Sequence, residues 1–183
     1  MKTATIVLLA ASAVTFGQSS EVGQRVENQQ DRVAQGVKSG SLTAGETANL
    51  EKKESAINQE VRTDRSLNGG HLTGQEKQVV NHQQNSMSKQ IYADKHNSAT
   101  QHYGKNEVDS RREKQQDRIA NGIKSGKLNA AQTSRLEKNE AAINKATRTD
   151  RAQNGGQLTA GEKSQINGQQ NAASRKIARA KHA

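Results

Sequence analysis

Residues 62–76 read RTDRSLNGGHLTGQE, and residues 148–162 read RTDRAQNGGQLTAGE. These stretches belong to a longer duplication, because residues 21–96 match residues 107–182 without a gap at a constant offset of 86 positions. Of the 76 aligned positions, 42 are identical. A match of this length at a single offset is typical of a repeat architecture. The sequence therefore predicts two copies of one structural unit.

Apolar residues in each copy recur at spacings of three, four and seven, which places them on one stripe of a helix. The chain has no proline, which favours long uninterrupted helices. We predict an all-α protein of two tandem three-helix modules, residues 21–96 and 107–182, joined by a polar linker at residues 97–106. In the first copy the three stripes are Val26, Val33 and Val37; Leu50, Ile57 and Val61; and Val79, Val80, Met87 and Ile91.

Turn signals separate the expected helices. Thr43 with Glu46, and Thr73 with Glu76, have the spacing of a capping box, in which each side chain binds a free backbone N–H of the first helical turn. Glycines precede both pairs, and glycine readily adopts the left-handed backbone that ends a helix. The second copy has the corresponding pairs Asn129 with Gln132 and Thr159 with Glu162.

Several residues on the stripes are unusual for a helical core. Gly36 costs about 1 kcal/mol relative to alanine inside a helix, and we expect a close helix approach to offset that cost. Gln30 and Gln84 also fall on the stripes. An unpaired buried amide costs about 1–3 kcal/mol, so we expect these amides to pair across helices or to lie at the rim of the core.

The first 17 residues have the pattern of a secretory signal peptide. Lys2 gives a positive start, residues 6–13 are apolar or small, and small residues stand one and three positions before Gln18. This order is that of a cleaved leader, and the apolar run is too short to span a bilayer as a helix. We predict a bacterial protein that is periplasmic or secreted, with a mature chain beginning near Gln18. The chain has no cysteine, so disulfides and thiolate chemistry are excluded.

The segment from Asp64 to Glu76 resembles the calcium loop of the EF-hand family. The resemblance implies oxygen ligands from Asp64, Ser66, Asn68 and Glu76. The segment departs from the family pattern because it is one residue too long, and because Ala152 replaces the serine in the second copy. We therefore predict an EF-hand-like arrangement of helices without a metal or other cofactor. A calcium-responsive module is the alternative.

The Leu-Thr pairs that open several helices resemble the Leu-Thr-x-x-Gln motifs of periplasmic Spy/CpxP-type helical stress proteins. They stand at residues 42–43, 72–73 and 158–159, with Leu-Asn at 128–129. This resemblance implies a chaperone-like or envelope-stress role, which is a second alternative. The duplicated pattern also resembles a family of secreted bacterial tandem-repeat helical proteins that has no assigned activity.

Charge is the main difference between the two copies. Residues 21–96 hold 10 basic and 10 acidic residues, whereas residues 107–182 hold 16 basic and 8 acidic residues. A net charge of +8 attracts polyanions. We predict that the second copy binds an anionic envelope polymer, an anionic lipid surface or a partner protein, without specific nucleic-acid recognition because few aromatic side chains are available for stacking. The candidate residues are Arg111, Arg112, Arg175, Lys176, Arg179 and Lys181.

Catalysis is not expected. The sequence has no serine elbow and no phosphate-binding glycine loop, which are the motifs of common hydrolases and nucleotide-binding enzymes. The five histidines lack the spacing that places two metal ligands on one helical face. Most acidic residues stand among lysines and arginines at helical spacing, and we interpret them as partners in solvated ion pairs.

Overall fold

The computed structural model describes residues 21–182 and is all-helical over that range, as predicted. The predicted leader at residues 1–17 lies outside the described residues. The first repeat forms α1 (Glu21–Ser39), α2 (Ala44–Leu67) and α3 (Gly74–Lys95), and the second forms α4 (Glu107–Lys124), α5 (Ala130–Gln153) and α6 (Ala160–His182).

Capping boxes begin the second and third helices of each repeat. The backbone N–H of Thr43 donates to the Glu46 carboxylate at 2.8 Å, and the N–H of Glu46 donates to the Thr43 hydroxyl at 3.3 Å. Thr73 and Glu76 form the same pair of bonds at the start of α3. These reciprocal bonds satisfy backbone donors that a helix leaves free at its start. The predicted capping boxes are confirmed, including Asn129 with Gln132 and Thr159 with Glu162.

The aliphatic stripes form the core, except that Val26 of α1 is only partly buried and Val79 of α3 is exposed. Val33, Leu50 and Ile91 are fully buried, whereas Val79 is 49% exposed beside the buried Val80. Adjacent residues of a helix point about 100° apart, so only one of this pair faces the core. The predicted cross-helix amide bonds are confirmed: Gln84 donates to the carbonyl of Val22 at 3.0 Å, and Gln30 donates to Glu51 at 3.2 Å.

Gly36 makes a close approach possible, but to the following turn and not to another helix. A Cβ at Gly36 would lie 2.6 Å from the Leu42 side chain, and the N–H of Leu42 donates to the Gly36 carbonyl at 3.0 Å. Gly122 and Leu128 repeat this arrangement in the second copy. The missing side chain therefore lets the leucine of each turn fold back onto its own helix and become fully buried.

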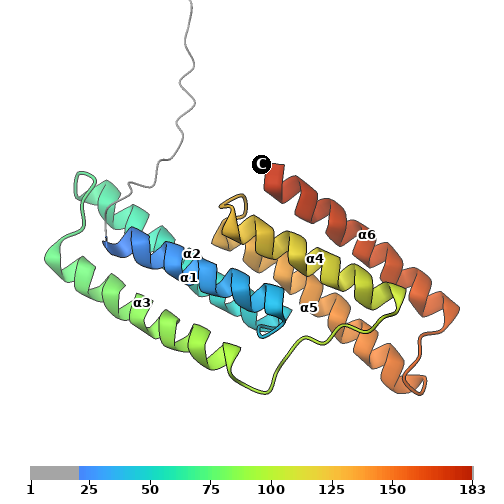
Figure 1. The fold of residues 1–183 in the computed structure, drawn as a ribbon. Coiled ribbons are helices and arrows are strands. Elements are labelled where there is room, and N and C mark those ends of the chain that lie inside the picture. The colour runs from blue at the N-terminus through green and yellow to red at the C-terminus, as the bar shows by residue number, and fades with distance from the viewer. Residues whose placement is uncertain (1–20, 183) are drawn as a thin grey trace, which may run out of the picture.

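The two repeats pack against each other through equivalent helices. The most extensive helix pair is α2 with α5, followed by α1 with α4, while α3 and α6 lie on opposite outer sides (Figure 1). The hydroxyl of Ser134 donates to the carbonyl of Ala48 at 2.8 Å, and these residues occupy the same position in the two repeats. Such contacts between equivalent positions are typical of two-fold packing.

The main hydrophobic core contains residues of both repeats, among them Leu50, Leu136 and Ile177. A smaller cluster around Val108, Ile143 and Ile166 lies within the second repeat. Because the main core is shared, the prediction of two tandem three-helix modules is not confirmed. The described chain is a single six-helix body in which the two repeats bury each other's surfaces.

Candidate functional site

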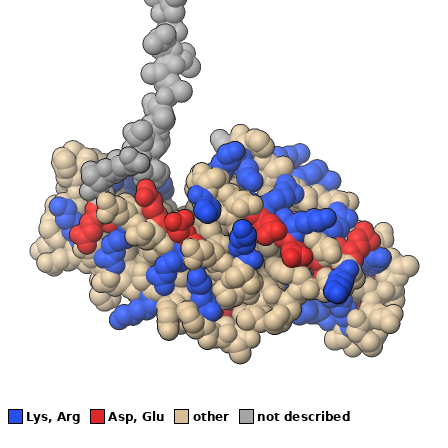
Figure 2. Space-filling view, in the orientation of Figure 1, with Lys and Arg blue, Asp and Glu red and all other residues tan. Residues whose placement is uncertain are grey.

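The exposed cations of α6 form one candidate site. Arg175, Lys176 and Arg179 are exposed on the last two turns of this helix, and Lys181 is partly buried. Arg175 and Arg179 share a face because they are four residues apart. None of the ion pairs formed within residues 21–182 involves these four cations. Figure 2 shows lysine and arginine side chains gathered over α6. We call Arg175, Lys176, Arg179 and Lys181 the α6 basic patch.

Arg111 and Arg112 occupy different environments from the α6 basic patch. Arg111 pairs with Glu107 at 3.9 Å and donates to Asn171. Arg112 is only 8% exposed and donates to Asp109 at 3.0 Å. Its guanidinium also lies 5.4 Å from the ring centre of Tyr103. Arg112 therefore joins Asp109 of α4 to Tyr103 of the connecting segment and is not available at the surface.

Asp109 is the partner that holds this internal cluster. Its carboxylate accepts hydrogen bonds from Arg112, Arg151 and Asn106. Burial raises the pKa of Asp109, but the bonds from Arg151 and Asn106 and the two guanidinium charges outweigh burial and hold the pKa below its ordinary value. The carboxylate is thus kept ionised between two cations.

The residues of the calcium-loop resemblance serve as helix ends. Asn68 donates its side-chain amide to both oxygens of Glu76, at 2.9 and 3.0 Å. The Glu76 carboxylate also accepts the backbone N–H of Thr73, and these bonds lower its pKa. Ser66 donates to a carbonyl of its own helix, and Asp64 stands in the last turn of α2. The Glu76 carboxylate is therefore engaged in capping, and within residues 21–182 no group of three His, Asp or Glu residues is arranged to hold a metal.

Four buried glutamates lie where the repeats meet, and they correct the interpretation of the acidic residues as solvated. Glu51 and Glu54 of α2 and their equivalents Glu137 and Glu140 of α5 are at most 1% exposed. Burial raises the pKa of Glu51 and Glu137 to about 8, although amide bonds from Gln30 and Gln116 lower it, and neighbouring carboxyl groups raise it further. Burial likewise raises the pKa of Glu54 and Glu140 to about 7. At neutral pH Glu51 and Glu137 are therefore mostly protonated and Glu54 and Glu140 partly so, which limits the repulsion between the four carboxyl groups.

The sequence carried a signal for these glutamates. Both repeats keep Glu at the two equivalent positions, and the spacing of three places them beside Leu50 and Ile57 on the stripe of α2. The sequence could not show that the equivalent stripe of α5 packs against the stripe of α2.

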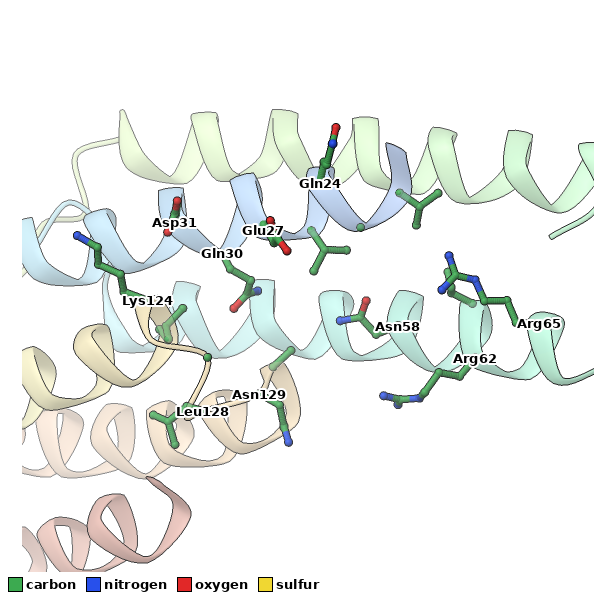
Figure 3. Close-up of a pocket in the computed structure, with 17 residues that line it drawn as sticks. Gln24, Glu27, Gln30, Asp31, Asn58, Arg62, Arg65, Lys124, Leu128 and Asn129 are labelled. Carbon is green, nitrogen blue, oxygen red and sulfur yellow. The ribbon is translucent and has the colours of Figure 1, made fainter. Parts of the chain in front are cut away.

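A groove of about 570 Å³ lies between α1, α2 and the turn from α4 to α5. In Figure 3, Gln30 and Asn58 lie between α1 and α2, and Leu128 lies on the α4–α5 turn below them. The remaining lining is partly apolar, from Val22, Val26, Val61 and Ile123, and partly charged, from Glu27, Asp31, Arg62, Arg65 and Lys124. We call this the first-repeat groove. The sequence did not indicate it, because its wall contains a turn from the other repeat.

No protein-family model, curated protein or solved structure matches this chain. Within residues 21–182, none of the helices contains an apolar stretch that could span a bilayer. A proposal for function therefore rests on the geometry and charge of the described residues.

Proposed function

We propose that the chain is an exported, non-enzymatic binding protein that attaches to anionic envelope polymers, such as lipopolysaccharide or acidic glycans, through the α6 basic patch. The observation that carries the proposal is the position of the cations. Arg175, Lys176 and Arg179 are exposed together on one helix end, and none of them takes part in an ion pair of the described chain.

The buried glutamates strengthen the attraction. The formal net charge of +10 counts every acidic residue as ionised. Glu51, Glu54, Glu137 and Glu140 have pKa values raised to about 7 or 8, so part of that negative charge is absent at neutral pH. The long-range field of the protein is therefore more positive than its formal charge.

Three local features favour α6 as the contact surface. Arg175 and Arg179 lie about 6 Å apart along the helix, from a rise of about 1.5 Å per residue, so both can contact one polymer chain. Lys176 donates to Asn139 of α5 at 3.1 Å, which uses one of its three donors. The cations also stand in the last turns of the helix, where the helix dipole favours positive charge.

Heparin retention tests the proposal. We expect a variant with all four patch residues replaced by Gln to elute at clearly lower salt than the unaltered chain, because the contacts are between exposed charges and are screened by salt. The matched control removes the same number of charges from exposed positions of the first repeat, by replacing Lys52, Lys53, Lys77 and Lys89 with Gln.

The control separates a local site from bulk charge. A smaller shift for the first-repeat control than for the patch variant supports the α6 basic patch. Equal shifts would show that only net charge matters, and unchanged retention of the patch variant would overturn the proposal. Repeating the comparison with immobilised lipopolysaccharide tests the envelope polymer directly.

A further inference from the structure

The first-repeat groove has an equivalent in the second repeat that is already occupied. At the offset of 86, the Ile123, Gly126 and Leu128 of the groove's turn correspond to Val37, Gly40 and Leu42. The helix residues of the groove wall correspond to residues of α4 and α5 in the same way. Residues 97–106, which connect α3 with α4, lie across this second place (Figure 1).

Residues 97–106 fill the equivalent site, between α4, α5 and the α1–α2 turn, with their backbone and one aromatic side chain. The N–H of Gln101 donates to the Gly40 carbonyl at 2.8 Å, and the Gln101 carbonyl lies 2.6 Å from the position of a Cβ on Gly40. The hydroxyl of Tyr103 is buried, and its ring packs under Arg112. Burial raises the pKa of Tyr103 beyond its ordinary range, and the charges that act on it include Glu137 and Glu140. The ring therefore points into the space between α4 and α5.

Equivalent residues are more buried in the second repeat, where residues 97–106 cover them, than in the first-repeat groove. Gly40 is buried, whereas Gly126 is exposed, and both have positive φ angles, of 73° and 68°. Asn144 is buried, whereas Asn58 is only partly buried. The first-repeat groove therefore presents the same backbone carbonyl and the same helix pair, without the segment that covers them in the second repeat.

Two sequence differences make the first-repeat groove more apolar and roomier. Val26 stands where the second repeat has Arg112, and Gly23 stands where it has Asp109. The buried ion pair of the second repeat thus has no counterpart in the groove. A wall of this kind favours a large apolar or aromatic side chain, because burial of apolar area is the main gain on binding.

We propose that the first-repeat groove binds an extended peptide segment of a partner protein that presents an aromatic side chain. The segment occupies the groove as residues 97–106 occupy its equivalent: a backbone N–H donates to the Gly126 carbonyl, and the aromatic ring enters between α1 and α2 beside Val26. This surface is separate from the α6 basic patch, so either proposal can fail without the other.

The chain itself offers a competing occupant. By the same offset, the stretch equivalent to residues 97–106 is residues 11–20, which lie outside the described residues. In a chain that begins at Gln18, only three residues remain before α1. Three residues are too few to fill the groove as the ten residues 97–106 fill its equivalent. We therefore expect the groove to be open in the processed chain.

The direct test uses a fluorescent peptide with the sequence of residues 97–106, NSATQHYGKN, and the chain that begins at Gln18. Fluorescence polarisation is expected to show saturable binding, and replacing the peptide's tyrosine with alanine is expected to weaken it by about tenfold or more. In the chain, Val26→Glu is expected to weaken binding similarly. Asn28→Glu adds the same charge to an exposed position of α1 outside the groove and is expected to leave binding unchanged.

A second measurement does not depend on how well the variants fold. Backbone amide resonances of the unaltered chain are expected to shift on peptide addition at Gly126 and Leu128, while those of Gly40 and Leu42 stay in place. Shifts confined to Gly40, Leu42 and the facing residues of α4 and α5, or equal binding by the Val26→Glu and Asn28→Glu chains, would overturn the proposal.

The length of the chain separates the competing occupants. Weaker binding by the full chain than by the chain from Gln18 supports the proposal and identifies the leader as a competitor. Self-association of the chain from Gln18 that disappears in Val26→Glu would overturn the partner peptide in favour of a second copy. Absence of binding to either chain would also overturn it.

Discussion

The two repeats have the same helical fold, but they differ in net charge and in whether residues 97–106 pack against them. Both have the same three helices, the same turn leucine folded onto a helical glycine, and the same pair of buried glutamates. The second repeat is covered by residues 97–106 and carries the net positive charge, whereas the first is neutral and has an open groove. Duplication thus preserved the residues that hold the repeats together, while single substitutions beside them gave each repeat its own surface.

The largest expected effect acts on what the repeats have in common. The four buried glutamates have folded-state pKa values raised to about 7 or 8 from an ordinary value of 4.5. Below pH 4.5 they are protonated in both the folded and unfolded states. Between pH 4.5 and 8 the unfolded chain releases their protons while the folded chain retains them, so stability falls as pH rises.

We expect the free energy of unfolding to fall by at least about 3 kcal/mol between pH 5 and pH 9, since each pKa unit corresponds to about 1.4 kcal/mol. Urea unfolding followed by circular dichroism at several pH values measures this. A Glu51→Gln, Glu137→Gln chain is expected to show a flatter profile. A stability that rises steadily over the same pH range would contradict the burial of these carboxyls.

The next effect concerns a contact that only the second repeat has. Asp109→Ala leaves Arg112 buried without its carboxylate, and breaking a buried ion pair by removing one partner costs about 3–5 kcal/mol. Chemical unfolding measures the loss. The double substitution Asp109→Gly, Arg112→Val copies the residues of the first repeat, Gly23 and Val26. We expect it to cost less than Asp109→Ala, because the buried Arg112 charge is removed as well and only the partly exposed Arg151 loses its partner. An equal or larger loss would show that the ion pair between Asp109 and Arg112 stabilises the fold by more than the cost of burying its charges.

A smaller effect compares one glycine in its two settings. Gly40 and Gly126 both have positive φ, so alanine costs about 1–2 kcal/mol at either position from backbone strain alone. At Gly40 the new Cβ would also meet the Gln101 carbonyl, whereas at Gly126 no atom lies within 4 Å. Thermal unfolding should therefore show a larger loss for Gly40→Ala than for Gly126→Ala. Equal losses would mean that the connecting segment does not lie on Gly40.

Local features of the fold could be predicted from the sequence, and packing features could not. The helices and their ends follow from apolar spacing, glycines and capping pairs such as Thr73 with Glu76, which act within a few residues. The exposure of Val79 illustrates the limit, because two adjacent valines both fit the stripe and only the neighbouring helices decide between them.

The buried glutamates and the first-repeat groove depend on contacts between the repeats, so the sequence alone revealed little of them. An isolated carboxyl is expected at the surface because its burial is costly, so the sequence alone predicts solvated positions for Glu51 and Glu54. In the fold, both are buried on α2, which packs against α5. The α6 basic patch was visible as a charge cluster. The groove required Leu128 of one repeat to lie beside α1 and α2 of the other, which no local pattern encodes.

The most direct test compares two equivalent asparagines. Asn58 lines the open first-repeat groove, and Asn144 lies in the equivalent site that residues 97–106 cover. The chain has no cysteine, so Asn58→Cys and Asn144→Cys, made separately, each introduce a unique thiol. If residues 97–106 cover only the second place, the thiol at position 58 should react with a small maleimide at least about tenfold faster than the thiol at position 144, whose labelling requires local opening. Equal rates, or faster labelling at position 144, would contradict the difference between an open first repeat and a covered second repeat.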